Sequence, residues 1–286
     1  MSDPDVSTVT HGEPPSGSAQ YVLAGDVAAT ELFNRRTLER DASDLMPLLR
    51  PDMRVVDLGC GAGSLTLAIA SIVAPGEVLG YDSQPLAIDR ARELAQQAPL
   101  QNVRFEVSNI ETLDLPEARF DVAHFSGTLG YLRNPLAALK LAYSALKSGG
   151  LVSIREPQKD GDWFGGPCAE GPTLFFQVAM HNWRAEGGDP CIGRRLAALL
   201  GEAGFVRIQQ RAVYSAALGE VKSAARQMLS TLERPELQAR AVARGWITAA
   251  MWDRLHDDIT VWAASDASIA AFAECSAIAW KPAATG

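Results

Sequence analysis

Short apolar runs alternate with stretches of helical spacing through the middle of the chain, and this alternation constrains the fold most strongly. The apolar runs are typical of parallel strands covered on both faces, and they occupy residues 54–58, 77–81, 103–107, 121–125 and 151–155. The helical stretches between them occupy residues 64–74, 85–97 and 135–147. Because crossovers between parallel strands are right-handed, the pattern predicts an α/β fold with a doubly wound, mostly parallel sheet.

Further elements follow this alternation along the chain. Residues 205–213 and 269–280 have the composition of strands, which brings the predicted sheet to seven strands. Residues 193–204 and 220–264 are predicted to be helical. These elements join the alternating segment, so we expect one domain over residues 51–286.

Three other segments differ from this pattern. Residues 1–18 carry few side chains that folding could bury, which predicts a disordered tail. Apolar residues recur at helical spacing over residues 19–50, which predicts N-terminal helices that cap the domain. Residues 157–190 begin with glycine, proline and aromatic residues and continue as an amphipathic stretch at 172–183. We interpret this last segment as a helical insertion that forms a lid at the ligand-binding edge of the sheet.

Composition excludes several classes of partner. The 286 residues include 26 Lys and Arg against 34 Asp and Glu, and basic residues do not cluster as nucleic-acid binding requires. No apolar run has the length of a membrane span, and the first residues do not resemble a secretion signal. The four cysteines are far apart and form no CxxC pair. We therefore expect a cytoplasmic protein with free thiols, no metal site, and neither nucleic acid nor membrane as partner.

A glycine-rich turn follows the first strand of the alternation and precedes a helix. It begins at Asp57 and contains Gly59, Gly61 and Gly63, which let a ligand lie against bare backbone. A dinucleotide-binding turn would need glycine where Ser64 stands, and Asp57 would repel a pyrophosphate. The acid and the turn amides instead suit a zwitterionic amino acid moiety.

A second acid, Asp82, ends the next strand, where its two oxygens can accept both hydroxyls of a ribose. An amino acid joined to a nucleoside is S-adenosylmethionine. Four sequence motifs also indicate this cofactor. They occupy residues 56–63, 80–82, 120–122 and 146–151. With these motifs the chain resembles the class I S-adenosylmethionine-dependent methyltransferases, in particular the small-molecule branch that includes the ubiquinone and menaquinone methyltransferases. The resemblance implies a Rossmann-like methyltransferase fold with S-adenosylmethionine as cofactor.

The resemblance also implies which residues bind the cofactor. They lie at strand ends, in the turns that follow, and in the N-terminal segment: Tyr21, Asp57, Gly59, Cys60, Gly61, Gly63, Asp82, Ser83, Asn109, Ile110 and Ser126. Asn109 stands where the family usually has an aspartate facing the adenine amino group, and its uncharged oxygen should make a weaker contact. Cys60 is interpreted as a small residue in the turn and not as a nucleophile.

The acceptor side is less defined by sequence. Tyr131 and Glu156 follow the fourth and fifth strands, where they either face the acceptor or act as surface or capping residues. Trp163, Phe176 and Trp183 either line an acceptor pocket or belong to an ordinary core. His181 is the candidate general base, which methyl transfer needs only if the acceptor must lose a proton.

These observations predict methyl transfer from S-adenosylmethionine to a small, hydrophobic or aromatic metabolite, as in secondary metabolism. All six tryptophans follow residue 160, in the half that departs from the cofactor motifs, which favours a flat or apolar acceptor. Two alternatives remain open: an enzyme that uses the same cofactor in a non-methylating reaction such as a cyclisation, and a non-catalytic binding protein. The sequence identifies neither the acceptor atom nor the oligomeric state.

Overall fold

A computed structural model describes residues 36–217 and 221–284 of the chain. The predicted tail at residues 1–18, Tyr21 and much of the predicted N-terminal cap lie outside the described residues. The described part of the cap contains a short helix, α2 (Leu38–Asp41), and a 3-10 turn, η1 (Met46–Leu48). Leu45 and Leu49 beside these turns are buried against the edge of the domain.

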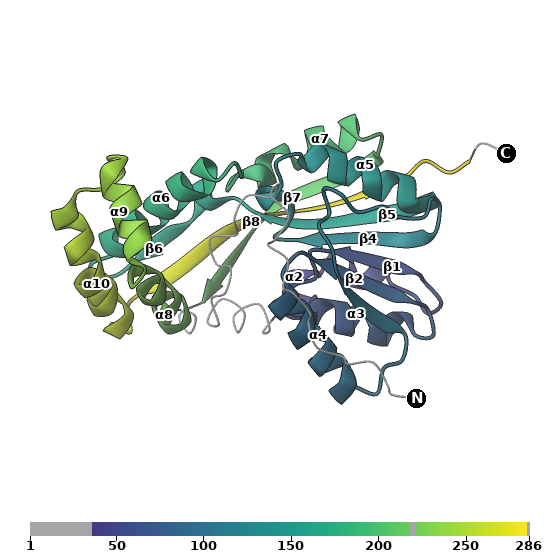
Figure 1. Cartoon of the computed structure of the whole chain (residues 1–286), viewed down its shortest axis with the longest axis horizontal. Coiled ribbons are helices and arrows are strands. Elements are labelled where there is room, and N and C mark those ends of the chain that lie inside the picture. The colour runs from purple at the N-terminus through teal and green to yellow at the C-terminus, as the bar shows by residue number, and fades with distance from the viewer. Residues whose placement is uncertain (1–35, 218–220, 285–286) are drawn as a thin grey trace, which may run out of the picture.

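The described chain forms an α/β structure around an eight-stranded sheet (Figure 1). Its strands are β1 (Val55–Leu58), β2 (Val78–Asp82), β3 (Val103–Val107), β4 (Phe120–Ser126), β5 (Leu146–Pro157), β6 (Trp163–Gly165), β7 (Val206–Ala217) and β8 (Ile269–Trp280). The first five run parallel in the order β3-β2-β1-β4-β5, and β8 is antiparallel to β5, β6 and β7. The predicted doubly wound, mostly parallel fold is confirmed. The strand beyond the predicted seven is β6, which lies within the predicted insertion.

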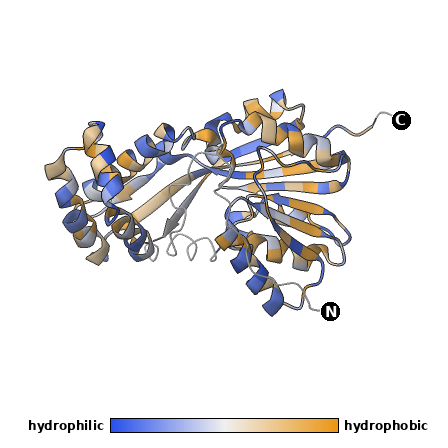
Figure 2. Cartoon of the chain, viewed as in Figure 1, coloured by the Kyte–Doolittle hydropathy of each residue, from blue (hydrophilic) through white to orange (hydrophobic). Residues whose placement is uncertain are grey.

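Three crossover helices connect the parallel strands: α3 (Ser64–Val73), α4 (Pro85–Gln97) and α5 (Pro135–Ala145). Proline opens α4 and α5 at a position where its missing N–H costs nothing, and the Asn134 side chain caps α5 by accepting from the Ala137 amide. The helix predicted to reach residue 147 ends at Ala145, because Leu146 already pairs with Phe120 as the start of β5. The parallel strands are largely apolar (Figure 2).

A second region, here called the helical region, lies beyond the carboxyl ends of the parallel strands (Figure 1). It contains α6 (Glu170–Ala185), α8 (Val221–Leu232), α9 (Pro235–Ala243) and α10 (Ala249–Ala264). These helices share a core that includes Phe175, Leu255 and Trp262. Strand β8 connects the two regions, because its first residues pair with β6 and its last residues pair with β5.

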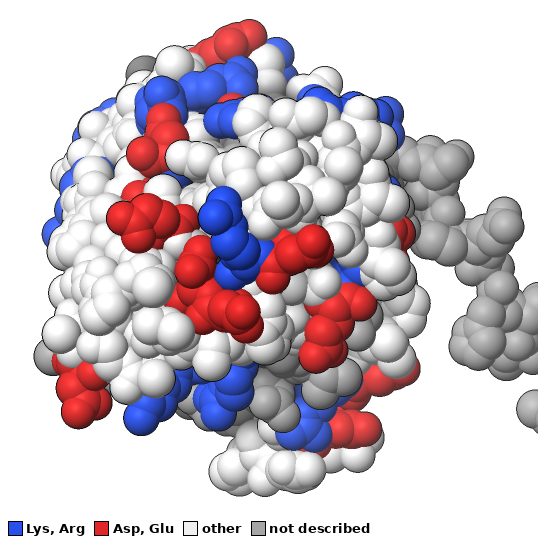
Figure 3. Space-filling model, turned by 90° about the vertical axis from the view of Figure 1, so that its left-hand side faces the viewer, with Lys and Arg blue, Asp and Glu red and all other residues white. Residues whose placement is uncertain are grey.

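The remaining elements join these regions. The predicted helix 193–204 is a 3-10 turn, η4 (Ile192–Arg195), followed by α7 (Leu196–Glu202). The turn η4 packs on β5 and β8, and α7 packs on β7 and β8. Two further 3-10 turns follow strand ends, η2 (Leu129–Tyr131) after β4 and η3 (Lys159–Gly161) after β5. Acidic and basic side chains are interspersed on the face shown in Figure 3. No helix in the described ranges is long and apolar enough to cross a membrane.

Candidate active site

The glycine-rich turn after β1 has the backbone geometry that its sequence predicts. Gly59, Gly61 and Gly63 all have positive φ, at 87°, 53° and 83°. A Cβ on Gly63 would lie 2.8 Å from the Phe105 ring, so glycine is required there for packing. A Cβ on Gly61 would meet no atom within 4 Å, so this glycine presents an open backbone face. Gly61 therefore offers the bare backbone against which a ligand can lie.

Asp82 at the end of β2 is held next to this turn. One carboxylate oxygen accepts from the Gly61 amide at 2.9 Å and the other from the Gln84 amide at 2.9 Å. Burial raises the pKa of Asp82, and the same amides act against that rise. Ser83 beside it is exposed. The turn and the second acid thus form one unit at the carboxyl edge of the sheet.

Asp57 lies beneath this unit, inside the protein. It is 2% exposed, and its carboxylate accepts from the Thr66 hydroxyl on α3 at 2.6 Å. His124 stands opposite it on β4, also buried, with Nδ1 3.3 Å from the Ser153 hydroxyl. Burial raises the pKa of Asp57 and lowers that of His124, and each group's charge opposes the other's shift. Among the described residues, His124 Nε2 has no hydrogen-bond partner.

Arg36 brings a positive charge to the same edge from the N-terminal segment. Its guanidinium donates to the Ser126 hydroxyl at 2.9 Å and to the Ser126 carbonyl at 3.1 Å, where β4 ends. A guanidinium is a strong partner for a carboxylate, so Arg36 suits the amino acid end of the cofactor. Arg36 is not among the predicted site residues, although the acidic and glycine-rich positions nearby are.

The predicted adenine contacts follow β3. The Asn109 side-chain oxygen accepts from the Glu111 amide at 2.9 Å, and Ile110 is 7% exposed. The Asn109 oxygen therefore shapes the turn in which it lies. Cys60 is partly buried in the glycine-rich turn, and burial raises its thiol pKa well above the ordinary value, followed in effect by the Asp57 and Asp82 charges.

Beyond β4 the structure brings three predicted acceptor residues together. Glu156 is 1% exposed, and its carboxylate accepts from the amides of residues 128–130. Trp183 on α6 donates its indole N–H to the Gly130 carbonyl at 2.9 Å. Its ring stacks on Tyr131 with centroids 4.1 Å apart. These residues join the loop after β4 to the helical region.

The other predicted acceptor residues lie in the helical region. Phe176 stacks on Phe164 of β6, with ring centroids 5.3 Å apart, and meets Phe272 of β8 edge to face at 5.9 Å. Trp163 is 49% exposed on β6. His181 is exposed, and its ring stacks on Trp246 at 5.6 Å.

Lys159, which is not among the predicted site residues, lies beside the aromatic rings. Its ammonium is 5.4 Å from the centroid of the Phe176 ring and 5.1 Å from that of Phe272. It also pairs with Asp162 at 3.1 Å. Its position in sequence, two residues after β5, could have indicated that it lies at the ligand-binding edge of the sheet. In the described ranges, no group of three or more His, Cys, Asp and Glu side chains is arranged to hold a metal ion.

The fold and this edge define a Rossmann-like enzyme with a site for an adenosyl cofactor. Residues 49–185 match the family described as a methyltransferase domain. The "Probable methyltransferase ltbC" of Aspergillus luteorubrus is 27% identical over 282 residues, covering 88% of this chain and 93% of that protein. The "Ubiquinone/menaquinone biosynthesis C-methyltransferase UbiE" of Ectopseudomonas mendocina is 32% identical over 152 residues, covering 51% of this chain and 57% of that protein.

A solved structure gives the same fold. The crystal structure of a putative methyltransferase from Bacillus halodurans has a TM-score of 0.57 and 18% identity, and covers 85% of this chain and 99% of that one. At this identity the likeness concerns the fold alone. Together with the domain match and the relatives, it shows that the chain is similar to S-adenosylmethionine-dependent methyltransferases. The open face of Gly61 and the carboxylate of Asp82 fit that cofactor.

Proposed function

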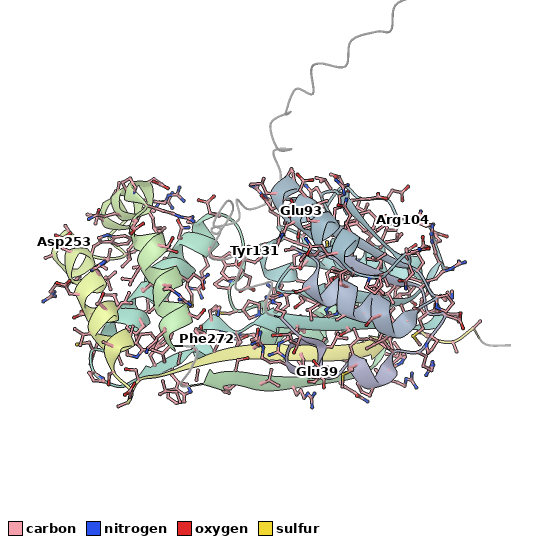
Figure 4. All side chains as sticks on the ribbon, turned by 90° about the horizontal axis from the view of Figure 1, so that it is seen from below. Glu39, Glu93, Arg104, Tyr131, Asp253 and Phe272 are labelled. Carbon is pink, nitrogen blue, oxygen red and sulfur yellow. The ribbon has the colours of Figure 1, made fainter. Side chains whose placement is uncertain are left out.

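We propose that this enzyme methylates a small, apolar or aromatic acceptor bound between the loop after β4 and the helical region. The observation that carries the proposal is the set of aromatic rings on one face of α6. Phe176 and Trp183 are seven residues apart and so share a helix face. They contact Phe164, Phe272 and Tyr131 from neighbouring elements. Figure 4 labels Tyr131 and Phe272, which lie where the two regions meet.

The charge of Lys159 restricts the proposed class of acceptor to molecules with an acidic oxygen. Its ammonium lies against the Phe176 and Phe272 rings and is mostly buried, with 20% of the side chain exposed. A buried positive charge favours a phenolate or an enolate over the neutral form, although Asp162 offsets part of this effect. A phenolic or enolic acceptor fits both the rings and the charge.

The cofactor supplies an activated methyl group when it is bound. The chain's own residues then have three tasks. Asp82 and the Gly61 backbone hold the ribose and methionine parts, and Arg36 faces the carboxylate end. The loop after β4 orients the acceptor, and the aromatic rings exclude water from it. We propose that this positioning supplies most of the rate enhancement.

His181 stays a prediction as the general base. It is two residues before Trp183 on α6, and residues at this spacing point to different helix faces. The Trp183 side chain contacts the loop after β4, whereas His181 is exposed beside Trp246. A phenolic or enolic acceptor stabilised by Lys159 needs less help from a base, so we expect a small contribution from His181.

We also propose that residues 157–190 act as a lid. Glycines flank β6, and Gly166 has a φ of 104°, a conformation that permits a sharp change of direction. The backbone of α6 at Gly171 packs closely on α10, since a Cβ there would lie 2.7 Å from Asp258. Any movement of α6 would therefore carry α10 with it, and the lid would close as part of the helical region.

An acceptor panel tests this proposal. The protein is incubated with S-adenosylmethionine and either hydroquinones and phenols or, as the matched comparison, aliphatic carboxylic acids, and products are identified by mass spectrometry. We expect methylated products from the aromatic set. Methylation of the aliphatic acids alone would contradict the proposed acceptor class. An altered but unmethylated product would favour the cyclisation alternative.

A further inference from the structure

Glu156 is directed into the protein, toward the loop that follows the neighbouring strand. It is the second-last residue of β5 and is 1% exposed. Its Oε1 accepts from the Thr128 and Leu129 amides, both at 2.8 Å, and its Oε2 accepts from the Gly130 amide at 3.2 Å. A single carboxylate thus satisfies three consecutive backbone N–H groups. This arrangement fixes the path of the loop, because each buried N–H would otherwise lack a partner.

The same loop contacts the cofactor turn at one end. The Thr128 side chain lies so close to Gly59 that a Cβ on that glycine would be 2.1 Å from the Thr128 hydroxyl oxygen. Gly127, which precedes it, has a φ of 64° and donates its amide to the Arg155 carbonyl at 2.7 Å. The position of Thr128 therefore limits how the glycine-rich turn can lie.

The other end of the loop contacts the helical region. The Gly130 carbonyl accepts from the Trp183 indole N–H at 2.9 Å and from the Asp189 amide at 2.8 Å. Space around Gly130 is limited as well, since a Cβ there would lie 2.9 Å from the Asp189 carbonyl oxygen. Tyr131 then stacks on Trp183. Residues 128–131 thus connect the cofactor turn with α6.

We propose that Glu156 is a positioning residue for methyl transfer, whose ionised carboxylate holds residues 128–130 so that the acceptor side of the site is aligned with the cofactor turn. The inference rests on the proposed function in one respect, that Trp183 and Tyr131 border the acceptor. The effect of Glu156 passes through the loop, because all of its hydrogen bonds described above are made to the loop backbone.

The charge state of Glu156 changes within an accessible pH range. Burial raises its pKa to about 7, although the amides of residues 128–130 and the Arg36 charge oppose the rise. Cys275 is its register neighbour on β8, and burial raises that thiol's pKa, so the thiol stays neutral. The Asp189 carboxylate, which follows α6, pairs with Arg195 and accepts from the Cys191 amide.

Protonation of Glu156 would disturb the loop. A protonated carboxyl group carries an O–H donor where one oxygen now accepts from a backbone N–H. As the pH falls through about 7, the proton would be taken up and the amides of residues 128–130 would lose part of their hydrogen bonding. We therefore expect turnover to fall in the same range.

The stability contribution of this group has the opposite sign. Its folded pKa of about 7 exceeds the ordinary value of 4.5, so the folded state holds the proton more strongly than the unfolded state. The contribution of Glu156 to stability is therefore full below pH 4.5 and falls as the pH rises to about 7. A role in stability alone would not lower turnover in acid. The two roles are separable by pH.

The first experiment uses the native protein without any acceptor. Amide and indole N–H signals are followed by NMR from pH 5.5 to 8.5, with S-adenosylhomocysteine bound. We expect the signals of residues 128–130 and the Trp183 indole to shift together, with a common midpoint near pH 7. Signals that stay constant, or that titrate at unrelated midpoints, would overturn the proposal. This result is independent of the acceptor class.

The second experiment compares Glu156→Gln with Asp121→Asn. The oxygen of Gln can still accept from the Thr128 and Leu129 amides. Its NH₂ group would face the Gly130 N–H, and because both groups are donors, no hydrogen bond can form between them. Asp121 is the control at the opposite end of β4, where its carboxylate accepts from the Arg54 amide at 2.8 Å and pairs with Lys147 at 2.8 Å. For Glu156→Gln we expect kcat with methylhydroquinone to fall about tenfold, affinity for S-adenosylmethionine to change less than about threefold, and the Trp183 signal to lose its pH dependence.

Two results with these variants would count against Glu156. Unchanged kcat in a folded Glu156→Gln protein would show that the loop does not need the carboxylate. If Glu156→Gln still loses activity at low pH, a group other than Glu156 causes that pH dependence. If Glu156→Gln does not fold, the titration of the native protein decides. If the native signals shift but methylhydroquinone is not methylated, the loop assignment stands and only the acceptor class fails.

Discussion

The candidate sites in the parallel part of the sheet and in the helical region consist of different kinds of chemical group. In the parallel part, the candidate cofactor groups are backbone amides and carboxylates whose positions follow from strand ends, as at Gly61 and Asp82. In the helical region, the candidate acceptor groups are aromatic side chains such as Phe176 and Trp183 that contact one another across separate elements. The first site depends on backbone conformation, whereas the second depends on how helices pack.

This difference predicts that substitutions in the two regions affect different quantities. A change in the parallel part should alter affinity for the cofactor, because it moves the backbone that the cofactor touches. A change in the helical region should alter turnover with little effect on cofactor affinity, because its side chains border the acceptor. The loop at residues 127–131 contacts both regions and is the place where the separation should be least complete.

The largest effect is expected for Gly59→Ala. The new Cβ would overlap the Thr128 side chain, and the positive φ disfavours any side chain. We expect affinity for S-adenosylmethionine, measured by calorimetry, to fall about a hundredfold or more. Gly149→Ala is the control, because Gly149 has a φ of 78° but no atom near its added Cβ. Equal affinity in the two variants would show that the contact between Gly59 and Thr128 does not influence cofactor binding.

Asp82→Ala should have the next largest effect. Its carboxylate is proposed to accept from the ribose hydroxyls, and the loss of charge-assisted hydrogen bonds should cost about 1.5 to 3 kcal/mol of binding free energy. Affinity for the cofactor should therefore fall roughly ten- to a hundredfold. Glu106→Ala, which removes an exposed acid from β3, is the control. Unchanged calorimetric affinity in folded Asp82→Ala would exclude the ribose assignment.

Phe176→Ala should damage turnover more than cofactor affinity. The ring is half-buried among Phe164 and Phe272, so its loss removes part of the proposed acceptor wall. We expect kcat/KM for the acceptor to fall about tenfold, with cofactor affinity within about twofold. Leu174→Ala is the control, since Leu174 is half-buried on the same helix but is two residues away and so points elsewhere. Equal loss of melting temperature, affinity and turnover would show that Phe176 is only part of the core.

Asn109→Asp should be tolerated. An aspartate has two oxygens, so one can accept from the Glu111 amide as Asn109 does now, and the other can face the adenine amino group. We expect cofactor affinity to stay equal or to rise by about threefold at most. A clear decrease would indicate that Asn109 faces another group, or that the nearby Glu111 carboxylate disfavours a second charge.

His181→Ala should have the smallest effect. Its side chain is exposed beside Trp246, on a different face of α6 from Trp183. We expect turnover with methylhydroquinone to change by less than about threefold across pH 6 to 9, with unchanged melting temperature. A loss of about a hundredfold or more would establish His181 as the general base and would require α6 to turn or move on acceptor binding.

The fold and the backbone conformation of the glycine-rich turn follow from local sequence. A parallel strand covered on both faces needs a continuous apolar run, and a turn with positive φ needs glycine, so both leave a pattern that can be read without coordinates. The strand end that carries Asp82 was predicted for the same reason, and β8 has the predicted bounds. The extra strand β6 was not predicted, because three residues are too short to show a period.

Tertiary structure alone decided where the other side chains point. Arg36 reaches Ser126 across ninety residues of sequence, and nothing in its neighbourhood along the chain indicates that contact. Glu156 was predicted to follow the fifth strand, but it is the second-last residue of β5, and the direction of its carboxylate depends on the loop that packs over it. The amphipathic pattern of α6 predicted a helix, whereas its rotation, which buries Trp183 and exposes His181, is set by packing against α10 and the loop after β4. Backbone conformation is encoded locally, while side-chain direction in a site depends on contacts between distant segments.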